Sequence, residues 1–314
     1  MADLSTHLGA LRLRNPVIAA SCEYTMTEDG IRACVDAGAG AVVAKSVNES
    51  PAAARQLDIA DYTLLDAAVV PRPWDGAVGD ETLFNRSGLA QTGIDDWVAM
   101  LDRTHRYAAE RGSAVIGSVT VASAEGAAAL AARMAEAVPA IEINVGAPHG
   151  REGTAVRQLT EAEGVGHYVR TVRAALDCPL IVKLPGQASD IVGMARAAAD
   201  NGADTVTVIG RLGGFVPNLD MWEPELGSWG AVGGHWMLPV SLYWVSKCFA
   251  ALGSGITSEG ADPVPPIPSV PVIGTNGARD GLDVVRFLLS GARAVELASL
   301  LLMRGAPALA DVVE

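Results

Sequence analysis

Short apolar stretches alternate with longer alanine-rich stretches along the whole chain. The apolar stretches are rich in Val, Ile and Ala without regular polar alternation, which is typical of strands buried on both faces of a parallel sheet. The eight predicted strands are Pro16–Ala20, Ala41–Lys45, Ala114–Val119, Ala140–Asn144, Leu180–Leu184, Thr205–Ile209, Val270–Gly274 and Ala294–Leu297. Helical patterns between them include Ser123–Ala137, Ala188–Asn201 and Arg279–Ser290. This order predicts an α/β protein with a (β/α)8 TIM barrel, ahead of a doubly wound open sheet.

Two long segments interrupt this repeat. Residues 46–93 and 210–238 follow the second and sixth predicted strands and are rich in Gly, Pro and Trp. Loops of this length inside a compact domain usually have a function or contain short elements of their own. Because loops that follow barrel strands build the active-site face, we expect both to border a site. A third stretch, 253–268, is expected to be a surface connection without chemistry.

Composition narrows the class of protein. The chain has 314 residues, half of them hydrophobic, and a formal net charge of −13. One α/β barrel accounts for this length, so we expect a single domain over residues 1–314. The negative charge disfavours nucleic acid and anionic membranes as partners, and no apolar run is long enough to span a bilayer. Four widely spaced cysteines fit a cytoplasmic protein better than a disulfide framework or a metal site.

Polar residues and glycines recur where the predicted strands end. Lys45 and Lys183 end the second and fifth strands, and Asn144 ends the fourth. A buried ammonium group is costly without an anionic or electron-rich partner, although a single lysine can also reach solvent along its apolar stem. The GTNG turn at 274–277 and the step Ala298-Ser299 follow the last two strands. Barrels often bind phosphate there through backbone N–H groups, which favours a phosphate site over a plain turn.

Together, ordered motifs at these strand ends resemble those of a known family. They are Asn15-Pro16 with Ala20-Ser21, Lys45-Ser46, Asn85-Arg86-Ser87-Gly88-Leu89, Asn144 with Pro148-His149-Gly150, Lys183-Leu184-Pro185, residues 189–204, Gly233-Gly234 followed by Pro239, and residues 272–277 and 290–299. From about Leu8 onward the chain resembles the FMN-binding barrel of class 1 dihydroorotate dehydrogenases. It resembles the pyrimidine-reducing domain of dihydropyrimidine dehydrogenase more closely.

This resemblance implies an FMN-dependent oxidoreductase with a defined set of site residues. Those it implies for FMN are Ala20, Ser21, Lys45, Ser46, Asn144, Lys183, Gly233, Gly234, Gly274, Asn276, Gly277, Ala298 and Ser299. Those on the substrate side are Asn85, Ser87, Gly88, Leu89 and His149. The two lysines would stabilise an anionic reduced flavin by their positive charge. The resemblance also implies a homodimer, and without a cysteine cluster for iron–sulfur centres the electrons need a separate donor or acceptor.

The chain departs from the family pattern on the substrate side. Related enzymes resemble one another in a motif N-x-S-C-P-N or N-x-S-C-P-H, whose cysteine (serine in other members) exchanges a proton with the pyrimidine. In this chain Gly146 stands in place of the motif's serine, and Ala147 stands in place of its cysteine. The methyl group of alanine cannot transfer a proton. The family's pair of substrate-facing asparagines is replaced by the stretch Val208-Ile209-Gly210-Arg211, so the amide groups that match a pyrimidine edge are missing. Both changes argue against orotate and uracil as substrates.

Several groups could supply the missing proton. His149 lies two residues from Ala147 and ranks first, with Lys45 and Asn144 as its catalytic neighbours. A loop histidine bonded to the backbone is the competing interpretation. His235, Cys22 and Tyr24 rank below it, in that order, and a lone cysteine at a strand end is more often a buried small hydrophobe.

Arg211 is a candidate for bidentate binding of a substrate carboxylate, beside the alternative of a solvated or salt-bridged arginine. Of the tryptophans near the sixth-strand loop, we expect Trp222 and Trp229 to wall the substrate pocket. Trp244 fits a subunit interface, where aromatic residues are enriched.

The leading hypothesis is an FMN-dependent oxidoreductase that acts on a CH–CH or C=C bond of a small carbonyl- or carboxylate-containing substrate. Reduction of an alkene next to a carbonyl, or oxidation of a substrate more acidic than dihydroorotate, fits the missing proton donor best. Two alternatives remain open. One is a non-redox relict barrel that binds a phosphorylated ligand or a protein partner, which Ala147 favours. The other is a dihydroorotate dehydrogenase with a relocated base.

Overall fold

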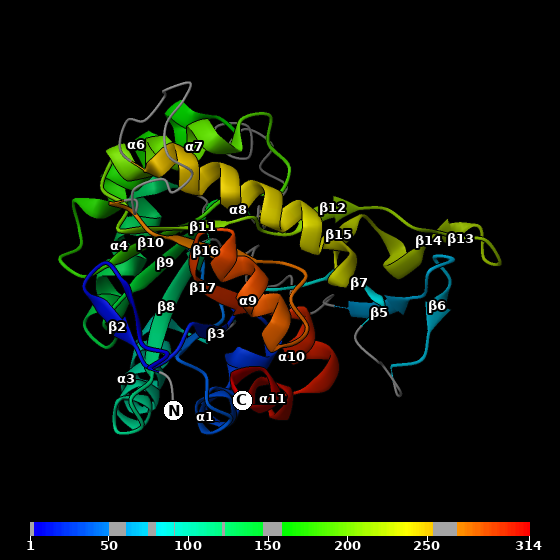
Figure 1. Cartoon of the computed structure of the whole chain (residues 1–314), viewed down its shortest axis with the longest axis horizontal. Coiled ribbons are helices and arrows are strands. Elements are labelled where there is room, and N and C mark those ends of the chain that lie inside the picture. Colours follow the sequence, from blue (N-terminus) through cyan, green and yellow to red (C-terminus); the bar gives the residue numbers. More distant parts are fainter. Residues whose placement is uncertain are drawn as a thin grey trace.

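All eight predicted strands form, and they close into one parallel barrel (Figure 1). The computed structural model of the chain describes residues 3–49, 61–74, 80–90, 92–120, 123–146, 159–253 and 269–314. The barrel strands are β3 (Val17–Ala19), β4 (Ala41–Val43), β8 (Ala114–Thr120), β9 (Ile141–Asn144), β10 (Leu180–Lys183), β11 (Thr205–Val208), β16 (Val272–Thr275) and β17 (Ala292–Leu297). Each pairs in parallel with its sequence neighbours, and β17 pairs with β3 to close the ring. The (β/α)8 prediction is confirmed.

Helices surround the barrel and pack on it through apolar faces. They are α1 (Glu28–Asp36), α3 (Ile94–Ala109), α4 (Ala124–Ala135), α6 (Ala162–Arg173), α7 (Ile191–Asp200), α8 (Leu238–Leu252), α9 (Gly281–Leu289), α10 (Ser299–Arg304) and α11 (Pro307–Val313). Side chains cap several of them. Ser123 accepts a hydrogen bond from the Gly126 N–H, and Asp190 accepts one from the Gly193 N–H, which satisfies N–H groups left free in a first helical turn. None of the described helices has both the length and the apolar character of a membrane span.

The barrel interior is apolar at one end and polar at the other. A hairpin of β1 (Thr6–Leu8) and β2 (Leu11–Leu13) contributes to a buried apolar cluster with inward-facing strand residues such as Ile18, Ile116 and Ile181. Two positions further along the same strands, the inward residues become Ser118 and Lys183. Because side chains alternate along a strand, both point to the same interior, at the end where barrel enzymes place their sites.

The two long loops together form a second sheet beside the barrel mouth. The first supplies β5 (Asp61–Leu65), β6 (Pro71–Arg72) and β7 (Thr82–Arg86), and the second supplies β12 (Leu212–Gly214) and β15 (Gly230–Gly233). They pair antiparallel in the order β12-β15-β7-β5-β6. A small ribbon of β13 (Pro217–Asn218) and β14 (Glu223–Pro224) extends farther from the barrel (Figure 1). The expectation that these loops contain elements of their own is confirmed, whereas the expected surface connection lies outside the described residues from position 254 to 268.

Candidate active site

A cavity lies between the polar end of the barrel and the added sheet. It encloses about 950 Å³ when the solvent space at its open mouth is included. Lys45 and Lys183 both border it, and so does Asn144. From the sheet side, Asn85 and Arg211 reach the same cavity. Residues that the sequence places at separate strand ends and in two separate loops are therefore brought together.

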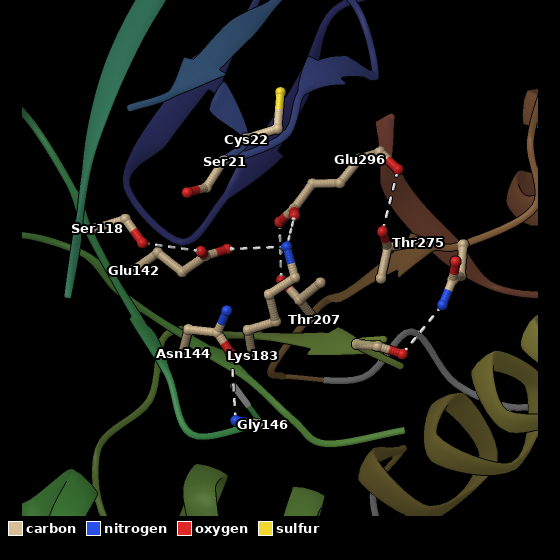
Figure 2. Close-up of polar contacts among 12 residues, drawn as sticks. Ser21, Cys22, Ser118, Glu142, Asn144, Gly146, Lys183, Thr207, Thr275 and Glu296 are labelled. Atoms are coloured by element: carbon tan, nitrogen blue, oxygen red, sulfur yellow. Dashed lines mark hydrogen bonds and ion pairs between the residues drawn. The ribbon is translucent and has the colours of Figure 1, made fainter. Parts of the chain in front are cut away.

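Lys183 stands inside the barrel between two glutamates (Figure 2). Its Nζ donates to Glu296 Oε2 and lies 3.8 Å from Glu142 Oε2. Thr207 Oγ1 donates to the other Glu296 oxygen at 3.1 Å. Burial alone would lower the pKa of Lys183, but the two carboxylates outweigh burial and raise it. The partner that a buried ammonium group requires is thus supplied by the chain itself.

A line of hydroxyl groups connects the cavity to Glu142. Ser21 Oγ and Ser46 Oγ are 3.1 Å apart, and Ser46 Oγ and Ser118 Oγ are 2.8 Å apart. Ser118 then donates to Glu142 Oε1 at 3.2 Å. Burial and the nearby Glu296 carboxylate raise the pKa of Glu142 to about 8, despite the opposing effect of Lys183. Glu142 is therefore mostly protonated at neutral pH, and Lys183 and Glu296 form the charged pair.

Lys45 also has a carboxylate partner, Glu23, on the short 3₁₀ turn η1 (Glu23–Met26). Its Nζ donates to Glu23 Oε1 at 2.9 Å, and the Gly88 N–H donates to the same oxygen at 3.1 Å. Burial lowers the pKa of Lys45, and the Glu23 charge opposes that effect. For Glu23, burial would raise the pKa, but Lys45 and the other donors hold it below its ordinary value. Sequence reasoning missed Glu23, which also borders the cavity.

Glycines shape one end of the cavity. Gly233, Asn276 and Gly277 border it there with Ala298 and Ser299. Gly277 has φ of +106°, a left-handed conformation that glycine adopts without strain. A Cβ at Gly233 would lie 3.0 Å from Asn276 Oδ1. A side chain at either position would crowd a neighbour or strain the backbone, so glycine keeps this end of the cavity free of a Cβ.

Arg211 is held from the sheet side by two of the predicted substrate residues. Its Nη1 donates to Asn85 Oδ1 at 2.9 Å and to Ser87 Oγ at 2.7 Å. Asn85 Nδ2 donates in turn to the Ala231 carbonyl at 3.2 Å. Among the described residues, none accepts a hydrogen bond from Arg211 Nε or Nη2, and the side chain borders the cavity. One nitrogen of the guanidinium is thus fixed, and its Nε–Nη2 edge has no acceptor among the described residues.

The other predicted residues divide into three groups. Ser21, Ser46 and Leu89 line the cavity. Ala20, Gly88, Gly234 and Gly274 do not border it, and the Phe287 ring fills the space that a Gly274 Cβ would need. His149 and Ala147 lie outside the described residues.

Two side-chain expectations gain no support. Trp222 and Trp229 are 92% and 78% exposed and do not line the cavity, so they do not wall a pocket here. His235 Nδ1 lies 2.9 Å from the Gly277 carbonyl and 3.3 Å from Asp283, which ties it to the glycine turn rather than to the cavity. No group of described His, Cys, Asp or Glu side chains has the arrangement of a metal site.

Comparison with known proteins agrees with this geometry. The sequence model of the family described as dihydroorotate dehydrogenase matches residues 3–314. The chain belongs to the dihydroorotate dehydrogenase family. It is 27% identical over 304 residues to the "Dihydroorotate dehydrogenase B (NAD(+)), catalytic subunit" of Bacteroides thetaiotaomicron, covering 95% of this chain and 87% of that protein. Proteins of the same name from Pyrococcus abyssi (27% identical; 99% and 92% covered) and Geobacter sulfurreducens (29%; 94% and 86%) are similar.

Membership of the dihydroorotate dehydrogenase family makes the chain an FMN-dependent oxidoreductase that acts on a CH–CH bond. The residues present fit that cofactor. Cationic side chains border the barrel side of the cavity, and glycines line one of its ends together with Ser299. The family's cofactor is therefore consistent with the donor groups in this chain.

Proposed function

We propose that the protein uses FMN to reduce a C=C bond, or to oxidise a CH–CH bond, in a small substrate that contains a carbonyl or carboxylate group and is not dihydroorotate. The observation that carries this proposal is that the two sides of one cavity, the barrel half and the sheet half, present different polar groups. The barrel half has Lys45, Lys183 and the glycine end, which fit FMN. The sheet half presents Arg211, with Asn85 engaged in holding it.

The barrel half would hold the cofactor. Ser21, Lys45, Asn144 and Lys183 would lie along the ring system. Gly233, Asn276, Gly277, Ala298 and Ser299 would hold the phosphate through backbone groups and the Ser299 hydroxyl. When bound, FMN supplies hydride chemistry. The chain's own contribution is a pair of buried ammonium groups, each ion-paired with a carboxylate, Glu23 or Glu296.

The sheet half would orient the substrate through its charge. A guanidinium binds a carboxylate best through two parallel N–H···O bonds, and the Nε–Nη2 edge of Arg211 is the edge left for them. The amide of Asn85 has both its oxygen and one N–H engaged, which leaves little to match a pyrimidine ring. The geometry thus supports an acid, such as a 2-enoate, over a neutral pyrimidine.

A second candidate is oxidation of dihydroorotate with a relocated base. The names of the relatives favour it, and Arg211 would also accept the carboxylate of dihydroorotate. Against it stand alanine at position 147 and the engaged Asn85. For this second candidate we retain His149 as the proposed relocated base, and Lys45 and Asn144 as further proposed catalytic residues.

Flavin spectroscopy tests the proposal. Protein purified with added FMN is expected to show bound-flavin bands in the visible, and the chemically reduced form is expected to be reoxidised anaerobically by 2-enoates or enones. The screen includes uracil, orotate and dihydroorotate. Absence of flavin binding would contradict the cofactor half. Rapid bleaching of the oxidised protein by dihydroorotate would replace the proposal with the second candidate.

We also propose that the protein forms a homodimer and exchanges electrons with a separate partner. The ribbon side of the added sheet exposes Phe215, Leu219, Met221, Trp222 and Trp229, and Phe215 packs near Trp229 with ring centroids 6.5 Å apart. Exposed apolar groups gathered in this way are typical of an interaction surface. Sedimentation of wild type against a Trp222→Ser/Trp229→Ser variant tests it, since the variant is expected to sediment as a monomer.

A further inference from the structure

Reduction of a C=C bond needs a proton as well as a hydride, and the family's proton-transfer side chain is absent at Ala147. The cavity therefore has to provide another acid. Most of its polar groups are engaged elsewhere. Lys45 donates to Glu23, and Ser21 and Ser46 bond to each other.

Tyr62 and the unengaged edge of Arg211 are exceptions. Tyr62 borders the cavity from strand β5, and its buried hydroxyl lies beside the Glu23 carboxylate without a well-formed hydrogen bond to any described residue. Its ring is fixed by an edge-to-face contact with Trp74, with centroids 6.2 Å apart. A buried hydroxyl whose hydrogen bonding is incomplete is costly, so its position at a cavity wall points to a ligand group that completes it.

The position of Tyr62 relative to Arg211 is chemically specific. Tyr62 on β5 is the cross-strand neighbour of Asn85 on β7, and paired residues project from the same face of a sheet. Asn85 holds the Arg211 guanidinium. In a 2-enoate, the carbon that takes the proton is the one bonded to the carboxylate. A carboxylate on Arg211 would therefore bring that carbon to the side of the cavity where the Tyr62 hydroxyl lies.

We propose that Tyr62 donates the proton to the carbon next to a substrate carboxylate bound by Arg211. This inference rests on the proposed function. A hydride that reduced flavin would supply would form a C–H bond at the β-carbon, and the alkene π electrons would move to the α-carbon. The Tyr62 O–H bond breaks as the α-carbon C–H bond forms. The phenolate that remains takes a proton from solvent water.

The charged surroundings keep this proton in place until it is needed. Burial and the neighbouring Glu23 carboxylate raise the pKa of Tyr62, so the phenol stays protonated throughout the neutral range. An enolate-type carbanion is basic enough to take a proton from such a phenol. The competing thiol, Cys22, is 3% exposed, and its sulfur points away from the Lys183–Glu296 pair (Figure 2).

Kinetics of the Tyr62→Phe variant test the proposal with tiglate, (E)-2-methylbut-2-enoate, as the probe. Proton donation contributes about 100- to 10,000-fold, so reoxidation of the reduced, FMN-loaded variant by tiglate is expected to slow by that factor. Reoxidation by ferricyanide forms no C–H bond and is expected to remain unchanged. Tyr243→Phe, on the exposed face of α8, is the matched control and is expected to behave as wild type.

The configuration of the product separates proton donation from a merely structural role. Wild type is expected to give one enantiomer of 2-methylbutanoate, because Tyr62 protonates one face of the α-carbon. The Phe variant is expected to give a mixture, since solvent then protonates both faces. Unchanged rate and configuration in Tyr62→Phe would overturn the proposal, and their loss in His149→Gln alone would assign the proton to His149.

A binding measurement keeps the inference separate from the proposed function. In protein labelled with ¹³C at tyrosine Cζ, the five tyrosines give signals that Tyr62→Phe assigns. Saturating 2-methylbutanoate is expected to shift the Tyr62 signal in wild type but not in Arg211→Met. A protein that binds FMN and does not reduce tiglate would contradict the proposed function, and this signal would still decide whether Tyr62 faces the bound acid. No shift in wild type would overturn its place in the site.

Discussion

The two walls of the cavity differ in how their polar groups are engaged. On the barrel wall, Lys183 and Lys45 are each neutralised by a carboxylate of the chain, and hydroxyl groups link the rest. On the sheet wall, Arg211 keeps one edge unengaged, and the Tyr62 hydroxyl, beside Glu23, makes no well-formed hydrogen bond to a described residue. A wall that is complete in itself can hold the same cofactor in every catalytic cycle. A wall whose polar groups lack hydrogen-bond partners suits a substrate, which is exchanged in every cycle and supplies those hydrogen bonds while it is bound.

The largest effect is expected from Lys183→Met. Removal of one partner of a buried ion pair costs about 3–5 kcal/mol of unfolding free energy, because Glu296 would remain buried without its cation. Denaturant unfolding measures this loss, and FMN affinity is expected to fall with it. Lys247→Met, on the surface of α8, is the matched control and is expected to leave both unchanged. Adding Glu296→Gln to the Lys183→Met variant should recover part of the stability, and no recovery would argue against the pair.

Arg211→Met is expected to affect the substrate wall only. Loss of charged hydrogen bonds costs about 1.5–3 kcal/mol, so the affinity for 2-methylbutanoate should fall about 10- to 150-fold in calorimetric titration. FMN affinity should stay within about twofold, because Arg211 belongs to the sheet side of the cavity. Arg211→Lys is expected to recover only part of the affinity, since lysine cannot form the bidentate pair. Equal acid affinity in all three proteins would remove the distinction between the two walls.

Glu142 links the barrel wall to pH. Its pKa rises from 4.5 in the unfolded chain to about 8 in the folded protein, so the folded state binds more protons between these values. Stability should therefore be full below about pH 4.5 and decline as pH rises toward 8, with a limiting slope of about 1.4 kcal/mol per pH unit. The groups that face this carboxyl are Ser118, Lys183 and Glu296. In Glu142→Gln, the unfolding free energy should lack this decline between about pH 4.5 and pH 8. An identical decline in wild type and variant would contradict the assignment to Glu142.

Ala147→Cys should have the smallest effect. The change restores a titratable group at the position where related enzymes have cysteine but leaves Asn85 bonded to Arg211, so ring recognition stays unavailable. Anaerobic mixing with dihydroorotate is expected to bleach the flavin no faster than in wild type. Ala147→Ser serves as the control of similar size. A large gain with cysteine would mean that the substrate wall still accepts the pyrimidine.

The sequence predicted the barrel better than the sheet for a physical reason. Strands such as Ala114–Thr120 are buried on both faces, which leaves an unbroken apolar run in the sequence. Strands β6 and β12 have only two or three residues, so no local pattern identifies them. The two loops join into one sheet through the pairing of β7 with β15, a contact between residues distant in sequence.

The sequence predicted the lysines of the candidate site but not the glutamates that pair with them. Lys45, Lys183 and Asn144 end strands, where a charged or polar residue stands out. Glu142 and Glu296 also interrupt apolar strands, a signal that sequence reasoning overlooked although each faces Lys183. Tyr62 and Glu23 carry no such signal, since each follows from how a loop folds back on the barrel. Residue type alone did not place the tryptophans, because an aromatic side chain suits a pocket and an exposed surface equally.

The difference between the walls can be measured in one titration. Oxidised, FMN-loaded wild type is mixed with 2-methylbutanoate or with uracil, and the visible flavin band is recorded. The acid is expected to give a saturable shift of the band that Arg211→Met lacks, while uracil gives none at the same concentrations. A saturable shift with uracil and none with the acid would contradict the account.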